Sequence, residues 1–166
     1  RSGGAVGKLK VATPLLPEDL SEAAKILEQR RLLDELLIAE GVEQPLLWYY
    51  TPMALPFSRH LSSRAVVYDC MDELSAFAGA PPALRELEGE LLERADVVLT
   101  GGQSLYEAKQ HRHPCVHAFP SSVDVAHFAQ ARRRGDDPAD QAQIPQPRLG
   151  FFGVIDERMD LALLDA

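Results

Sequence analysis

The sequence predicts an α/β fold built on a parallel sheet, and three observations support this prediction. Short apolar runs of strand length recur at residues 46–50, 65–69, 96–100 and 115–119. Segments with apolar residues at steps of three and four, typical of helices with one buried face, separate or precede these runs. The run 97–99 is continuously apolar, as in a parallel strand that is covered on both faces. Alternation of this kind is typical of α/β proteins.

The first part of the chain is expected to contain three strands and a long helix. Residues 8–13 are a strand candidate that ends before Pro14. A helix is expected over 20–39, with its leucines and alanines on one buried face, and Gly41 is placed to end it. The strand at 46–50 must end at Pro52, because proline cannot continue a ladder. A short helical turn at 53–60 and the strand at 65–69 follow.

Two further helices, at 82–94 and 105–110, precede the strands at 96–100 and 115–119. Asp124 is a candidate N-cap for a short helix over 125–131. Residues 132–147 are charged, polar and proline-bearing, which predicts a linker or surface loop. The α/β alternation then starts again, with a strand expected at 148–153 and the beginning of a helix at 159–164.

The composition places the chain among ordinary globular proteins, because its 46% apolar and 25% charged residues are close to the average. A formal net charge of −8 argues against a nucleic-acid partner, since phosphate neutralisation needs clustered lysine and arginine. No apolar run approaches the roughly 18 residues of a membrane-spanning helix. Cys70 and Cys115 lie within or just after strand-like runs, so we expect reduced, buried thiols in a cytoplasmic protein.

Four short motifs carry a resemblance to a known family. They are WYYTP at 48–52, VYDCMDE at 67–73, PSSVDVAHF at 120–128 and GFFGVIDER at 150–158. In this order they resemble retaining-type glycosyltransferases of the GT-B fold, family 4-like, in particular the teichuronic-acid and exopolysaccharide subgroup. The resemblance covers the chain from about residue 10 to its end, with a variable stretch near 132–147.

The resemblance implies a Rossmann-like parallel sheet flanked by helices and divides the chain into parts. Residues 1–131 are expected to be a partial acceptor-side (GT-B N-terminal) domain. Residues 132–147 are expected to be a linker or surface loop, and 148–166 the first β-α unit of the donor-side domain. Because most of the C-terminal donor-binding domain is then missing, we expect the isolated fragment to be inactive.

The same resemblance implies the reaction and the partners of the full-length protein. It would transfer a sugar from a nucleotide-sugar donor to a saccharide or lipid-linked acceptor in cell-envelope or exopolysaccharide synthesis. The expected location is the cytoplasm, including peripheral association with the inner face of the membrane. We predict no cofactor and no metal site. Apolar faces that the fragment leaves exposed would allow self-association.

Asp69, Asp72 and Glu73 are candidates for an acceptor-side cleft, because they are expected at the loop edge of the sheet, where α/β proteins gather their ligands. Carboxylates there could accept hydrogen bonds from acceptor hydroxyls, or accept a proton. The alternative is that Asp72 caps a helical turn at 74–78.

Thr100, Gly101 and Ser104 form a second acceptor-side group. They lie in a glycine-bearing turn between a strand and a helix, where backbone amides can meet an anion or a hydroxyl. The spacing is that of neither a P-loop nor a dinucleotide fingerprint. The alternative is that Gln103 or Ser104 simply caps the helix.

The resemblance also assigns an interdomain turn and a donor site. The family's usual turn is Pro-Asn-Gly-Val-Asp, and here Ser121, Ser122 and Asp124 occupy it. Gly153 and Arg158 match the glycine and the basic residue that meet the donor diphosphate in the family. The alternative for Arg158 is an ion pair with its acidic neighbours at 156–157.

Catalytic residues remain unassigned, and one further function is consistent with the sequence. The aromatic residues at 48–50 could form the floor of a sugar site or belong to the core. The second function is that of a non-catalytic Rossmann-like module, which binds a small polar ligand or a partner chain through exposed apolar faces.

Overall fold

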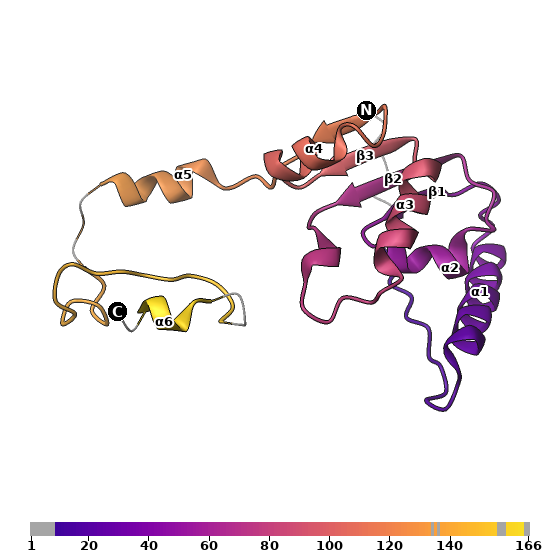
Figure 1. Ribbon diagram of the computed structural model, residues 1–166, viewed down its shortest axis with the longest axis horizontal. Helices are drawn as coiled ribbons and strands as arrows, with labels where there is room; N and C mark the ends of the chain where they lie inside the picture. Colours follow the sequence, from indigo (N-terminus) through magenta and orange to yellow (C-terminus); the bar gives the residue numbers. More distant parts are fainter. Residues whose placement is uncertain (1–8, 134, 136, 156–158, 165–166) are drawn as a thin grey trace, which may run out of the picture. The chain divides into compact units, whose positions relative to one another are not determined.

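The computed structural model describes residues 9–133, 135, 137–155 and 159–164. The chain forms two units (Figure 1). The first unit ends at Ser122 and contains the sheet, and the second begins at Val123.

The first unit is built on a four-stranded, all-parallel sheet, which confirms the predicted α/β class and is consistent with a Rossmann-like fold. Its strands are β1 (Leu46–Tyr49), β2 (Ala65–Cys70), β3 (Val97–Thr100) and β4 (Val116–Ala118). They lie in the order β1-β2-β3-β4, so each strand pairs with the next one along the chain. The strands coincide with the predicted runs to within a residue or two.

Helices cover one face of the sheet. They are α2 (Leu55–Ser58), α3 (Leu84–Arg94) and α4 (Gln103–Lys109), each in a connection between neighbouring strands. Right-handed crossovers between adjacent parallel strands place such helices on the same side. The core between this face and the helices consists of the buried side chains of Tyr49, Leu55, Tyr68, Cys70, Leu91, Leu92, Ala95 and Val98.

The long helix α1 (Glu22–Ala39) precedes the sheet and has well-defined ends. The Ser21 hydroxyl accepts a hydrogen bond from the Ala24 amide at 3.3 Å. Gly41, with φ of 66°, ends the helix: its amide donates to the Ile38 carbonyl, and the next amide donates to the Leu37 carbonyl. This is a Schellman motif, so the predicted stop is confirmed.

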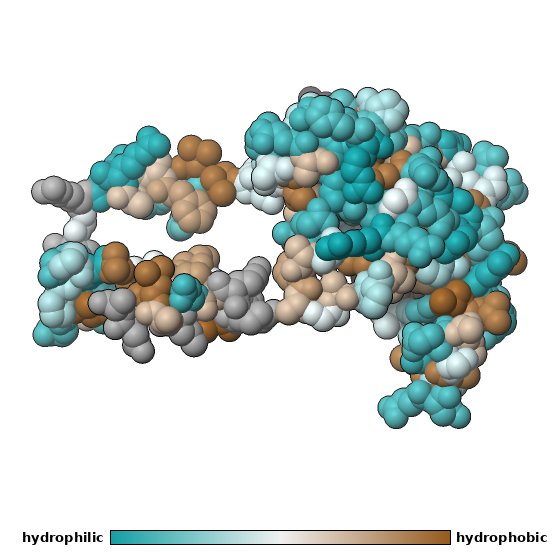
Figure 2. Space-filling view, in the orientation of Figure 1, coloured by the Kyte–Doolittle hydropathy of each residue, from teal (hydrophilic) through white to brown (hydrophobic). Residues whose placement is uncertain are grey.

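The predicted burial of one face of α1 is wrong. No residue of α1 is fully buried, and Leu27 and Leu36 of the predicted face are 66% and 38% exposed. Figure 2 shows brown, hydrophobic residues at the surface over this helix. The leucine spacing predicted the helix itself, but α1 packs mainly against the short helix α2, which is too small to cover its apolar face.

The face of the sheet opposite the helices also carries exposed apolar side chains. Side chains alternate along a strand, so Trp48 and Asp69 point away from the helix-covered side on which Tyr49 and Tyr68 lie. The Trp48 indole donates to the Asp69 carboxylate at 3.1 Å. Trp48 is 47% exposed and Leu46 is 53% exposed. Tyr49 is a core residue whose hydroxyl lies 2.7 Å from Oγ of Ser58, within hydrogen-bond distance.

Two predicted strands are absent from the described residues. Residues 9–13 and 148–153 are neither strand nor helix. Val11 and Leu149 are 85% and 97% exposed. A strand needs a neighbouring strand for its backbone hydrogen bonds, and neither segment has one in the described chain.

The described residues of the second unit form the short helical segments α5 (Val125–Phe128), η3 (Ala129–Arg132) and α6 (Leu161–Leu164). The carboxylate of Asp124 accepts the amide of His127 at 2.9 Å, which confirms the predicted N-cap. The described residues between 133 and 147 form turns and irregular chain. In the described parts of the chain, no helix has the length and apolar character needed to cross a membrane.

Candidate functional site at the carboxyl edge of the sheet

The segments that follow β1 and β2 border an open, shallow pocket at the carboxyl edge of the sheet. The first segment begins with Thr51 and the 3-10 helix η1 (Pro52–Ala54). The second is the β2–α3 connection, residues 71–83, which contains the 3-10 helix η2 (Leu74–Ala76). The pocket has a volume of about 270 Å³ and is lined mainly by apolar side chains. The lining residues are Thr51, Met53, Leu74, Phe77, Ala78, Gly79, Ala80, Pro81 and Leu84.

The loops that follow β2 and β3 touch each other through their backbones. The Gly101 amide donates to the Cys70 carbonyl at 2.9 Å. A Cβ atom added to Gly101 would lie 2.5 Å from the carbonyl oxygen of Met71 and 3.0 Å from its Cα. Only glycine allows the two loop backbones to come this close without moving apart. Gly101 therefore brings the two predicted acceptor-side groups to one edge.

We expect Gly101→Ala to lower the free energy of unfolding by about 1–3 kcal/mol, because overpacking against backbone forces the loops apart. Urea denaturation measures the effect. Gly102→Ser is the matched control, since a Cβ there has no neighbour within 4 Å and serine is a favoured N-cap for α4. Equal stability of Gly101→Ala and the wild type would contradict the close approach.

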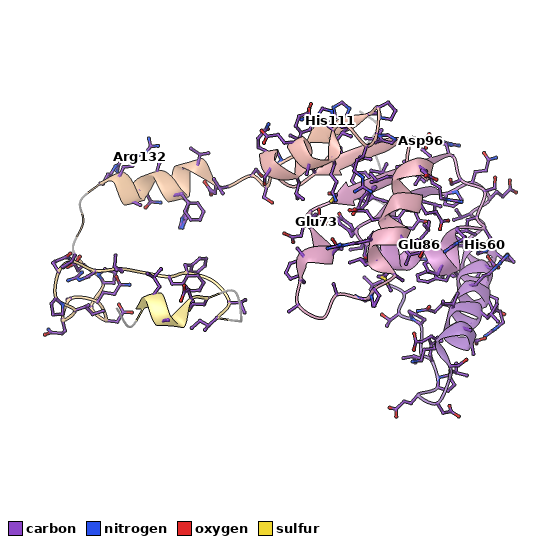
Figure 3. The ribbon with its side chains drawn as sticks, viewed as in Figure 1. His60, Glu73, Glu86, Asp96, His111 and Arg132 are labelled. Carbon is purple, nitrogen blue, oxygen red and sulfur yellow. The ribbon has the colours of Figure 1, made fainter. Side chains whose placement is uncertain are left out.

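The structure separates the three predicted carboxylates. Asp69 lies within β2 rather than after it, and its side chain is on the sheet face with Trp48. Glu73 projects from the β2–α3 connection (Figure 3) and is engaged in an internal ion pair. Asp72 is exposed. Its predicted capping role is not found, because η2 has no side-chain cap. Asp72 is therefore the most exposed of the three carboxylates, because Asp69 is half-buried and the Glu73 side chain is 37% exposed.

The turn after β3 is likewise only partly accessible. Thr100 is fully buried, and its hydroxyl lies 3.4 Å from the carbonyl oxygens of Gly102 and His117. Ser104 is exposed. The N-cap of α4 is Gly102 and makes no side-chain hydrogen bond, so the capping alternative for Gln103 and Ser104 is not found. Gln103 and Ser104 are the exposed residues of this turn, and the two glycines are half-buried.

A partly buried ionic cluster ties the β2–α3 connection to α3 and α4, and we call it the Lys109 cluster. The side chains of Lys109 and Glu88 are buried, whereas those of Glu73 and Arg112 are 37% and 43% exposed. The Lys109 side chain is 3% exposed, and its ammonium donates to Glu73 and to Glu88 at 2.7 Å each. Glu88 also accepts from the Tyr68 hydroxyl at 3.0 Å and from Arg112 at 3.0 Å. The cluster joins α4, α3, β2 and the connection with balanced charge.

The charges and hydrogen bonds of the cluster fix its protonation. Burial disfavours the Lys109 ammonium, but hydrogen bonds to its two carboxylate partners outweigh burial and raise the pKa of Lys109. Burial likewise opposes ionisation of Glu73, but hydrogen bonds from Lys109 and Ser75 outweigh it and lower the pKa of Glu73. Burial is the main cause that raises the pKa of Tyr68 and that of Cys70. At neutral pH the ion pair is charged, and the phenol and thiol are neutral.

Sequence reasoning found Glu73 but not Lys109 or Glu88. A signal was present, because Glu88 falls in the buried stripe of α3 that contains Leu84, Leu87 and Leu91. A charged residue in an apolar stripe needs a partner of opposite charge. The sequence alone did not identify that partner.

The remaining predicted residues are divided between the two units. Ser121 and Ser122 are exposed at the end of the first unit, and Asp124 belongs to the second unit as a helix cap. Gly153 is exposed in a segment without strand structure. Arg158 lies outside the described residues.

The two cysteines and His113 have structural roles in the first unit. Cys70 and Cys115 are free thiols, with Cys70 buried as predicted and Cys115 only half-buried. The Cys115 amide donates to Nδ1 of His113 at 3.1 Å, so Nε2 carries the proton and donates to the Ala95 carbonyl at 2.9 Å. Among the described residues, no group of three or more histidine, cysteine or acidic side chains could hold a metal ion.

The first unit is a parallel α/β unit of Rossmann-like type. An apolar pocket and polar loops lie at the carboxyl edge of its sheet. No protein-family model matches the chain, and a search of curated proteins finds no match.

Proposed function

We propose that the chain belongs to a glycosyltransferase that moves a sugar from a nucleotide-sugar donor to a saccharide or lipid-linked acceptor, with the acceptor bound at the carboxyl edge. One observation carries the proposal: the loop after β2, which touches the loop after β3 at Gly101, also lines a pocket at the edge where parallel α/β proteins bind ligands. The reaction class comes from the resemblance of the sequence motifs to GT-B enzymes. On this hypothesis the enzyme works in the cytoplasm, at or near the inner face of the membrane.

The pocket and its rim suit an acceptor with both apolar and hydroxyl-bearing surface. Met53 and Phe77 offer apolar surface, as most small-molecule sites do. Asp72 offers an exposed carboxylate at the start of the same connection, and an ionised carboxylate accepts several hydrogen bonds from hydroxyl groups. The proposal also includes donor binding by Gly153 and Arg158, which is supported only by the resemblance of the sequence motifs.

The test is sugar transfer by the protein that carries this chain, with UDP- and GDP-sugars as donors and oligosaccharides as acceptors. We expect Asp72→Asn to lower kcat/KM about 10- to 100-fold, because hydrogen bonds to a charged group contribute about 1.5–3 kcal/mol. The melting temperature should not change, since Asp72 is exposed. Asp19→Asn, at another exposed aspartate, is the control and should match the wild type. Absence of transfer with every activated sugar, or wild-type activity of Asp72→Asn, would refute the proposal.

The exposed sheet face favours a second candidate, a non-catalytic module. Parallel sheets are usually covered on both faces, yet Leu46 and Trp48 are about half exposed on this one. A module would bind its partner chain there without transferring sugar. The transfer assay separates the two candidates. Trp48 fluorescence that shifts on self-association, together with absent turnover, would favour the module.

A further inference from the structure

Lys109 is bonded to the segment that forms one wall of the carboxyl-edge pocket, but it is itself buried and does not line the pocket. Lys109 is 2% exposed. Its ammonium lies 2.7 Å from the Glu73 carboxylate, and Leu74, the next residue, lines the pocket. Both oxygens of Glu73 are occupied, one by Lys109 and the other by the Ser75 hydroxyl at 2.8 Å. The Glu73 side chain is 37% exposed, and its carboxylate is already engaged within the connection and with α4.

The second carboxylate of the Lys109 cluster anchors this contact to the rigid part of the unit. Glu88 lies on α3 and accepts from Lys109, Tyr68 and Arg112. Tyr68 belongs to the central strand β2 and is 1% exposed. A chain of hydrogen bonds thus runs from the sheet core through Glu88 and Lys109 to Glu73.

We propose that Lys109 is a positioning residue for the carboxyl-edge pocket, which it holds in shape by tying Glu73 and the β2–α3 connection to α3 and β2. That the pocket receives an acceptor rests on the proposed function, whereas the positioning role rests on the contacts alone. Residues 74–81 provide most of one wall, and within the connection itself the described backbone hydrogen bonds are local. Loss of the tie is therefore expected to release the wall without unfolding the sheet.

Amide hydrogen exchange of the chain, followed by NMR, tests the positioning role. Lys109→Met could unfold the unit, so the diagnostic variant is Glu73→Ala, which leaves Lys109 paired with Glu88. We expect exchange of the Leu74, Ala76 and Ala80 amides to accelerate about 10- to 100-fold, as loss of a charge-assisted hydrogen bond predicts. Glu73→Gln keeps an acceptor for Lys109 and should show a smaller acceleration.

Glu22→Ala is the matched control, because Glu22 also pairs with a lysine at 2.7 Å but on the exposed surface of α1. It should leave exchange in the connection unchanged. Unchanged rates in Glu73→Ala would overturn the proposal. So would an acceleration that extends equally to the Val98 amide of β3, because it would show global destabilisation. The exchange experiment needs no donor or acceptor, so its failure is independent of the transfer assay.

Discussion

Lys109→Met is expected to lower the free energy of unfolding by about 3–5 kcal/mol, the typical cost of removing one partner from a buried ion pair. Methionine is close to lysine in length, but it leaves Glu88 with one cation and Glu73 with none. The Glu88 side chain is only 10% exposed, so solvent cannot replace the lost ammonium. Urea denaturation at neutral pH measures the difference. Lys25→Met removes a half-buried lysine from its pair with the exposed Glu22 and should cost no more than about 0.5 kcal/mol.

The pH dependence of stability gives the same variant a second readout. The pKa of Glu73 is lower in the folded state, so its interaction stabilises the fold above the unfolded pKa of about 4.3 and is lost as the pH falls through the folded value. The pKa of Lys109 is raised, so its contribution is present below the unfolded value of about 10.4 and is lost at higher pH. Because Lys109→Met lacks the pair, its stability should fall less steeply between about pH 5 and pH 3 than that of the wild type. If the stability of the wild type and of Lys109→Met fell in parallel over this pH range, the Lys109–Glu73 pair would not contribute to the pH dependence of stability in acid.

The sheet could be predicted from sequence because its strands are short apolar runs that alternate with helix-like segments. The run at 65–69 became β2, and the run at 96–100 became β3. Residues 9–13 and 148–153 have similar local composition, yet they are not strands. Strand formation depends on a neighbouring ladder, which local pattern cannot show.

The candidate site was only partly predictable for a related reason. The edge itself followed from the β-α-β order, and Asp72 was correctly placed in a loop there. The role of Glu73 could not be predicted, because Lys109 is 36 positions away in the sequence and reaches it only through the packing of α4. The exposure of α1 was missed because leucine spacing shows which residues share a face but not whether a neighbour is large enough to cover it.

Leu91→Ala should also be strongly destabilising, by about 2–5 kcal/mol, because Leu91 is fully buried. It belongs to the core cluster that joins α3 to the sheet, together with Leu55 and Tyr68. Truncation removes apolar contacts and leaves a cavity that the helix cannot fill without moving. Leu84, at the start of the same helix, lines the carboxyl-edge pocket, so a displaced α3 would also widen that pocket.

Urea denaturation of Leu91→Ala checks this prediction, with Leu27→Ala as the control. Leu27 is 66% exposed on α1, and alanine suits a helix at least as well as leucine, so the control should lie within about 0.5 kcal/mol of the wild type. A loss below about 1 kcal/mol for Leu91→Ala would mean that α3 is not held by this core. In that case the Lys109 cluster would lose the rigid anchor on which its positioning role depends.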